Sequence, residues 1–109
     1  MAFVRACSTA DVEHDQPFHF DTDGDPIAIV LLEGEYFAID DTCTHDNWSL
    51  CDGYIEGDEI VCSLHLARFA IRTGEVRMAP AFEPLRTYPI KVENNEIWVD
   101  IEAGRGEAW

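Results

Sequence analysis

Two short segments of the chain each place a histidine close behind a cysteine. The first is a C-x-H sequence formed by Cys43 and His45, and the second is a C-x-x-H sequence formed by Cys62 and His65. Thiolates and imidazoles suit a tetrahedral Zn²⁺ or a mixed-ligand iron–sulfur centre, whereas Ca²⁺ and Mg²⁺ prefer oxygen ligands. These four residues therefore predict a metal centre rather than a packing role.

The segments that carry these ligands fall between predicted strands. Short runs of β-branched and aromatic residues alternate with turn residues, a pattern typical of an all-β fold. The runs predict strands over Phe3–Cys7, Phe18–Asp21, Ile27–Leu32, Tyr36–Asp40, Tyr54–Glu56, Glu59–Cys62, Arg68–Ile71, Glu75–Met78, Arg86–Val92 and Glu96–Asp100. Two loops, Asp41–Asp52 and Ser63–Ala67, carry the chemistry, and Asp11–Gln16 is expected to hold one helical turn. Ala103–Trp109 is expected to be a loosely held tail.

The length of the chain and its net charge limit the number of domains and the kinds of partner that the protein can have. The 109 residues predict one domain over 1–109. Twenty-two acidic residues against seven basic ones give a net charge of −15, which disfavours nucleic acid and anionic membranes as partners. The N-terminus lacks the pattern of a secretory signal and no apolar run reaches the length of a bilayer span. We therefore expect a cytoplasmic protein, in which cysteines more often bind metal than pair as disulfides.

The ligand spacing resembles the Rieske iron–sulfur motif, in which C-x-H is followed, here after sixteen residues, by C-x-x-H. Nearly the whole chain, from Phe3 to Ile101, is similar to Rieske ferredoxins of bacterial aromatic-ring dioxygenases of the biphenyl and toluene type. The similarity rests on Trp48-Ser49-Leu50, Gly57-Asp58, Cys62-Ser63-Leu64-His65, Phe69, Thr73-Gly74 and Pro80. It implies a Rieske-like fold of antiparallel sheets, with a small cluster-binding subdomain formed by two loops within residues 41–67.

The resemblance also implies the cofactor and the role of each ligand. One [2Fe–2S] cluster would be bound, with Cys43 and Cys62 on the inner iron and His45 and His65 on the outer iron. Two ferric ions, two sulfides and two thiolates sum to zero charge, so one added electron leaves a single negative charge. Such a centre has no open position for substrate and suits one-electron transfer.

The expected role is that of an electron carrier and not of an enzyme. The resemblance implies that electrons arrive from an NADH-dependent flavin reductase and leave to the terminal oxygenase of an aromatic-ring dioxygenase system. In respiratory Rieske proteins, hydroxyl side chains two and four residues past the second histidine donate hydrogen bonds toward the cluster. Ala67 and Phe69 occupy these positions and cannot donate, which predicts a low reduction potential.

Two positions depart from the Rieske pattern. Asp46 follows the first histidine where relatives often have glycine, and Leu64 stands where respiratory members have a disulfide-forming cysteine. The second departure leaves Cys51 without an obvious disulfide partner and argues against the respiratory branch. Cys51 is expected to be a thiol near the ligand loops, and Cys7 a small buried hydrophobe.

Other interpretations stay open at this point. A Cys₂His₂ zinc-stabilised interaction module would use the same four ligands, and a Rieske-like small subunit of a nitrite reductase is a further alternative. Trp48 and Phe69 are expected to pack in the core, and His14 and His19 to be solvated.

Overall fold

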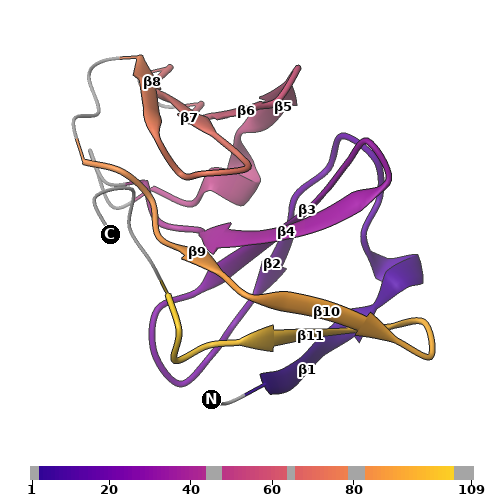
Figure 1. Ribbon diagram of the computed structural model, residues 1–109. Coiled ribbons are helices and arrows are strands. Elements are labelled where there is room, and N and C mark those ends of the chain that lie inside the picture. The colour runs from indigo at the N-terminus through magenta and orange to yellow at the C-terminus, as the bar shows by residue number, and fades with distance from the viewer. Residues whose placement is uncertain (1–2, 44–47, 64–65, 79–82, 105–109) are drawn as a thin grey trace.

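The computed structural model describes residues 3–43, 48–63, 66–78 and 83–104. These residues form three antiparallel sheets joined by turns and two short 3₁₀ segments (Figure 1). The expectation of an all-β fold of antiparallel sheets is confirmed.

One sheet brings the two ends of the described chain together. Its strand order is β1-β11-β10, and Phe3 at the start of β1 lies opposite Asp100 at the end of β11. Asn94 and Asn95 both have positive φ, which makes the tight turn between β10 and β11. The strands are β1 (Phe3–Ser8), β10 (Ile90–Glu93) and β11 (Glu96–Asp100).

The second sheet leads directly into the first ligand loop. Its strand order is β2-β3-β4-β9, and a turn at Glu33 and Gly34, again with positive φ at both residues, joins β3 to β4. Strand β4 ends two residues before Thr42, so the loop starts from a fixed edge of the sheet. The strands are β2 (Phe18–Phe20), β3 (Ile27–Leu32), β4 (Glu35–Asp40) and β9 (Thr87–Tyr88).

The third sheet is inserted in the chain between β4 and β9. It lies at the top of Figure 1, apart from the other two sheets, and its strand order follows the sequence. The strands are β5 (Tyr54–Glu56), β6 (Glu59–Val61), β7 (Arg68–Ala70) and β8 (Val76–Met78). The first ligand loop runs into this sheet and the second connects β6 to β7, so the sheet supports both loops.

The single strand expected over Arg86–Val92 is wrong. Pro89 divides this run into β9, which pairs with β4, and β10, which pairs with β11. Proline has no N–H for a sheet ladder, and the Pro89 carbonyl instead accepts a hydrogen bond from the Asp100 N–H at 3.0 Å. One run of sequence therefore serves two sheets.

The helical turn expected within Asp11–Gln16 is also displaced. The 3₁₀ segment η1 spans Thr9–Asp11. It starts earlier because Ser8 and Asp11 form a capping box, in which each side chain accepts a hydrogen bond from the other end of the segment. The second segment, η2 (Leu50–Asp52), lies in the first ligand loop.

Strand β3 separates two hydrophobic cores. Ala28, Val30 and Leu32 pack into one core with the third sheet, while Ile27 and Ile29 pack into the other with the first sheet. This division follows from the two-residue repeat of a strand that is buried on both faces. Cys43 and Cys62 belong to the first core, and Cys7 to the second.

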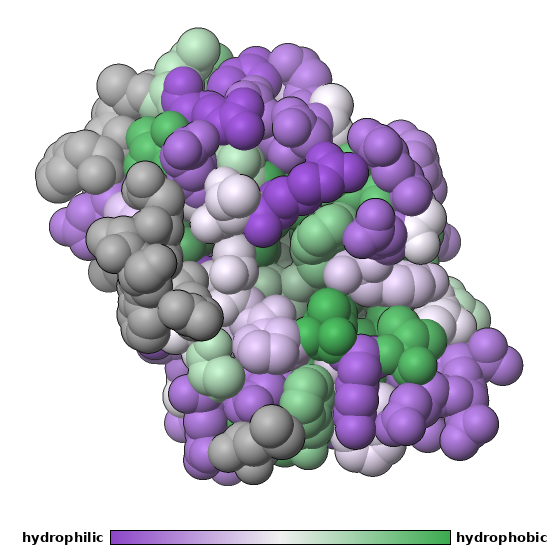
Figure 2. Space-filling model, in the orientation of Figure 1, coloured by the Kyte–Doolittle hydropathy of each residue, from purple (hydrophilic) through white to green (hydrophobic). Residues whose placement is uncertain are grey.

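The surface is largely polar. Figure 2 shows hydrophilic side chains over most of one face, with hydrophobic ones in small separate patches. Among the described residues, the large apolar side chains that are exposed are Trp48, Tyr54, Leu66, Met78 and Val92. No helical segment in this part of the chain has the length and apolar character that a membrane crossing requires.

Candidate metal centre

The two ligand loops close in the same way. The Cys43 N–H donates to the Trp48 carbonyl at 2.9 Å, and the Cys62 N–H donates to the Ala67 carbonyl at 2.9 Å. Each loop therefore begins at a cysteine and returns to it five residues later. His45 and His65 fall inside these closed loops in sequence, and both lie outside the described residues.

Cys43 and Cys62 lie at the base of the two loops, where each loop meets the hydrophobic core. Cys43 is 1% exposed and Cys62 is 0% exposed, and both pack in the same apolar core as Leu50 and Phe69. Two thiols held in one water-poor core are suitable donors for iron or zinc, since both metals accept thiolate. The described half of the predicted donor set therefore fits a metal centre at the loop bases.

A side-chain hydrogen bond links the loops. The Trp48 indole N–H donates to the Ser63 hydroxyl at 3.2 Å. Trp48 is 40% exposed, so the expectation that it packs in the core is wrong, while Phe69 is fully buried as expected. The indole of Trp48 therefore links the two loops through its hydrogen bond to Ser63, and it does not pack in the core.

The second loop contains a residue in a disfavoured backbone conformation. Leu66 has a φ of 60°, in the left-handed region, and its side chain is exposed. A non-glycine residue there costs roughly 1–2 kcal/mol. The Leu66 N–H donates to the Cys62 carbonyl at 2.9 Å, which helps to hold this conformation and makes the loop tight around Cys62.

A buried carboxylate lies at the start of the first loop. Asp41 is 1% exposed, and its Oδ1 accepts the Cys51 backbone N–H at 3.0 Å. Its Oδ2 accepts the Ser49 hydroxyl at 2.7 Å and faces His19 Nδ1 at 3.1 Å. Asp41 is not recognisable from the sequence, because an acidic residue after a strand usually marks a solvated turn. His19, which contacts this carboxylate, comes from β2, 22 residues away in the sequence.

His19 lies between two carboxylates. Its Nε2 is 2.8 Å from Asp21 Oδ1, and its Nδ1 faces Asp41. The hydrogen bond to Asp21 is the main cause that raises the pKa of His19 above its ordinary 6.5; burial opposes this shift, and the charge of Asp41 adds to it. His19 is exposed, as expected, but both of its ring nitrogens lie beside carboxylates; His14 is also exposed and pairs with Asp15.

The thiol of Cys51 lies beside this pair. A ring nitrogen of His19, a carboxylate oxygen of Asp41 and the Cys51 sulfur lie within 4.8 Å of one another. Burial, a hydrogen bond to Asp41 and the negative charge nearby raise the pKa of the thiol far above its ordinary value. Asp41 therefore links the imidazole of His19 and the thiol of Cys51 in one hydrogen-bonded cluster.

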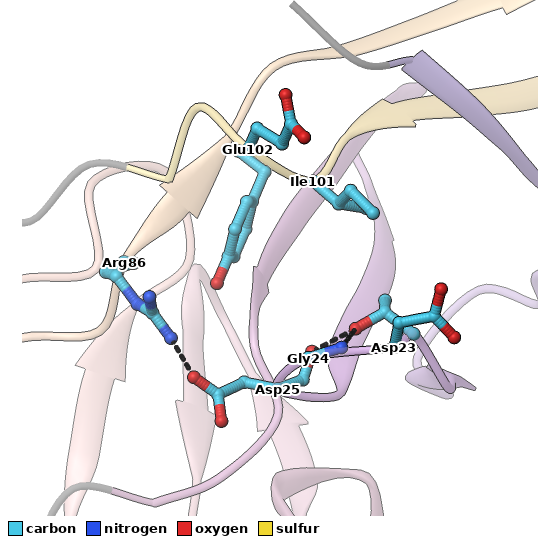
Figure 3. Close-up of a pocket in the computed structure, with 8 residues that line it drawn as sticks. Asp23, Gly24, Asp25, Arg86, Ile101 and Glu102 are labelled. Carbon is cyan, nitrogen blue, oxygen red and sulfur yellow. Dashed lines mark hydrogen bonds and ion pairs between the residues drawn. The ribbon is translucent and has the colours of Figure 1, made fainter.

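The preceding residue, Asp40, contacts Arg86 and Tyr88, whereas Asp41 contacts His19. Its Oδ1 accepts the Tyr88 hydroxyl at 2.6 Å, and its Oδ2 accepts the backbone N–H and Nε of Arg86 at 2.8 and 3.1 Å. Arg86 extends across a pocket of about 360 Å³ to pair with Asp25 at 2.6 Å (Figure 3). Burial and the hydrogen bond to Asp40 raise the pKa of Tyr88. This network fixes the end of β4 from which the first loop departs.

Comparison with known proteins gives a consistent result. Residues 2–89 match the family model described as Rieske [2Fe-2S] domain. The chain is 40% identical over 104 residues to the ferredoxin component of biphenyl 2,3-dioxygenase from Rhodococcus jostii RHA1, covering 95% of this chain and 97% of the relative. It is 43% identical over 101 residues to a biphenyl dioxygenase ferredoxin subunit from Pseudomonas sp. KKS102, covering 92% and 93%.

Solved structures show the same similarity. The ferredoxin of Sphingomonas yanoikuyae B1 superposes with a TM-score of 0.87 at 33% identity, covering 91% of this chain and 98% of that one. The ferredoxin in a complex of reduced oxygenase and oxidized ferredoxin in carbazole 1,9a-dioxygenase gives 0.84 at 28%, covering 89% and 91%. A Mycobacterium tuberculosis nitrite reductase small subunit gives 0.80 at 17%, covering 90% and 93%, a likeness of fold alone.

Proposed function

Because the chain belongs to the Rieske [2Fe-2S] domain family, we propose that it carries single electrons from a flavin-dependent ferredoxin reductase to the terminal oxygenase of an aromatic-ring dioxygenase. It holds one [2Fe–2S] cluster and is an electron-transfer component rather than a catalytic enzyme. When bound, the cluster accepts and releases one electron at a time. The observation that carries the proposal is the pair of matching loops closed at Cys43 and Cys62.

The proposed ligands are Cys43 and Cys62 for the inner iron and His45 and His65 for the outer iron. The support is the burial of both cysteines in one core and the position of each histidine within a loop that closes on its cysteine. Residues 1–109 are proposed to form one Rieske domain. In this arrangement the cysteines hold the cluster against the core, and Trp48 with Ser63 keeps the two loops together.

The partners are proposed from the relatives. The ferredoxin of the carbazole system occurs in a complex with its oxygenase, and the curated relatives are dioxygenase components. A terminal ring-hydroxylating oxygenase is therefore the proposed acceptor. A flavin-dependent reductase that oxidises NADH is the proposed donor, and the protein is proposed to work with it in the cytoplasm. The nitrite reductase alternative has only the likeness of fold, and the zinc alternative does not agree with the family's cofactor.

The proposal is tested by following electrons through the purified protein. The protein is expected to be brown, to stay oxidised with NADH alone and to bleach when NADH and a flavin-dependent ferredoxin reductase are both added. Adding a biphenyl-type oxygenase with biphenyl and oxygen should restore the oxidised spectrum and yield hydroxylated product. A colourless, zinc-loaded protein, or a brown protein that the reductase does not reduce, would contradict the proposal.

A hydroxyl donor placed near the cluster should raise the reduction potential. Ala67 and Phe69 are fully buried in the core that contains both cysteines. Ala67→Ser or Phe69→Tyr adds a hydroxyl group that can donate toward the cluster sulfurs, which favours the reduced form. We expect a rise of some tens of millivolts, where about 59 mV is tenfold in a one-electron equilibrium. Ala70→Ser, on a buried neighbour farther along β7, is the control, measured by the same voltammetry.

An unchanged or lower potential in both variants, with the cluster intact, would mean that positions 67 and 69 do not face the cluster sulfurs. The visible spectrum reports whether the cluster is intact. The comparison is made at one pH and one salt concentration, so that only the added hydroxyl differs.

A further inference from the structure

Asp41 and His19 form a charged pair beneath the first ligand loop. Asp41 lies two residues before Cys43 and is almost completely buried, so solvent screens its charge poorly. The backbone fixes it from both sides: its N–H donates to the Pro26 carbonyl at 3.1 Å, and its carbonyl accepts the Leu50 N–H at 2.6 Å. The carboxylate is therefore held at a constant place relative to the loop.

The pair also ties the loop to the second sheet. Through its two oxygens Asp41 binds Ser49 and Cys51 on the far side of the loop, and through Oδ2 it contacts His19 on β2. Thr42 and Ser49 form an isolated antiparallel bridge directly above. Strand β2 is thus connected to the first ligand loop by one side-chain contact.

The geometry favours a positive His19. Both ring nitrogens of His19 face carboxylate oxygens, of Asp21 and Asp41, and only the protonated ring has a hydrogen to donate from each nitrogen. The third titratable group facing it is the thiol of Cys51, which remains protonated for the reasons given above. Asp21 is largely exposed and solvated, so the buried charge that His19 balances is that of Asp41.

We propose that Asp41 and His19 are positioning residues for electron transfer: Asp41 places a fixed negative charge beneath the first ligand loop, and His19 offsets it. The inference rests on the proposed ligation of the cluster by Cys43. Reduction adds one electron to the cluster, so a nearby negative charge opposes it and a nearby positive charge assists it. The pair therefore acts on the reduction potential as well as on the position of the loop.

The test compares two variants that remove opposite charges. Asp41→Asn keeps an oxygen acceptor but removes the negative charge, and at pH 6 it should shift the one-electron equilibrium toward the reduced form by about tenfold, roughly 59 mV upward. His19→Gln removes the positive charge and should shift the equilibrium in the other direction, by about threefold. At pH 9 more of the parent's His19 is neutral than at pH 6, so the difference between the His19→Gln potential and the parent's should be smaller at pH 9.

His14→Gln is the matched control, because His14 is exposed, pairs with an acidic neighbour and lies outside the ligand loops. Its potential should equal that of the parent at both pH values. A histidine titration by NMR supplies a second measurement: Asp41→Asn should lower the pKa of His19.

The outcomes separate this inference from the proposed function. If the parent protein contains no cluster, the proposed function fails. If the cluster spectrum is unchanged but the two potentials move in the same direction, or stay within twofold of the parent at pH 6, the charged-pair inference fails and the proposed function stands. Should Asp41→Asn not assemble, His19→Gln still decides, since a potential equal to the parent's at pH 6 contradicts the inference.

Discussion

Cys43→Ser and Cys62→Ser are each expected to abolish the visible spectrum of the cluster. Both thiols are buried at the bases of the two loops, and a serine hydroxyl is a much poorer ligand for iron than a thiolate. Because the cluster joins the two loops, its binding energy is also folding energy. We therefore expect the variants to lose iron and to unfold at lower temperature, measured by iron content, visible absorption and thermal melting.

The other two cysteines provide the controls. Cys7 lies in the second core, and burial raises the pKa of its thiol to about 11, as expected for an inert, packed thiol. Cys51 lies beside the first core and is hydrogen-bonded to Asp41. Cys7→Ser and Cys51→Ser should keep the full spectrum. A Cys43→Ser protein that kept its spectrum would refute the ligand assignment.

Gly74→Ala, in the turn between β7 and β8, is expected to cause a large loss of stability. Gly74 has a φ of +76°, and a Cβ added there would lie 2.2 Å from the backbone oxygen of Leu85. The left-handed conformation costs an alanine roughly 1–2 kcal/mol, and overpacking against rigid backbone adds about 1–3 kcal/mol. The free energy of unfolding, measured with urea on the cluster-loaded protein, should therefore fall by about 3 kcal/mol.

Gly57→Ala is the matched control for this substitution. Gly57 has a similar φ of +62° in the turn between β5 and β6, but a Cβ there meets nothing within 4 Å. It should lose only the conformational cost, roughly 1–2 kcal/mol. Equal losses at the two positions would show that the contact between Gly74 and Leu85 adds nothing to stability.

The sequence predicts those parts of the fold that local chemistry decides. The hairpins at Gly34 and at Asn94 and Asn95 are found where turn residues interrupt apolar runs, because positive φ suits these residues. The division of the run 86–92 into two strands at Pro89 is not predicted, although a proline within an apolar run indicates that a strand can end there. An apolar run that changes sheets looks the same as one long strand, and the change is decided by which strands lie alongside.

Some residues of the candidate site can also be predicted from the sequence, and others cannot. The motifs that contain Cys43 and Cys62 predict a metal centre, because ligand type and loop position can be recognised in the sequence. Asp41 could not be identified in that way, because its burial and its contact with His19 on β2 depend on how segments far apart in the sequence pack together. Trp48 was misplaced because its partner, Ser63, lies on the other loop. Residues defined by contacts between distant segments need the structure.

The alternation along β3 bears on how the protein acquires its cofactor during biosynthesis. Ile27 and Ile29 serve a core that contains neither Cys43 nor Cys62, so that core can form in the apoprotein. A newly made chain in an iron-starved cell would keep this half folded, with only the ligand loops and their sheet awaiting the cluster. The machinery that delivers iron and sulfide would then meet a prefolded scaffold rather than an unfolded polypeptide, and supply of the cofactor would be separated from synthesis of the chain.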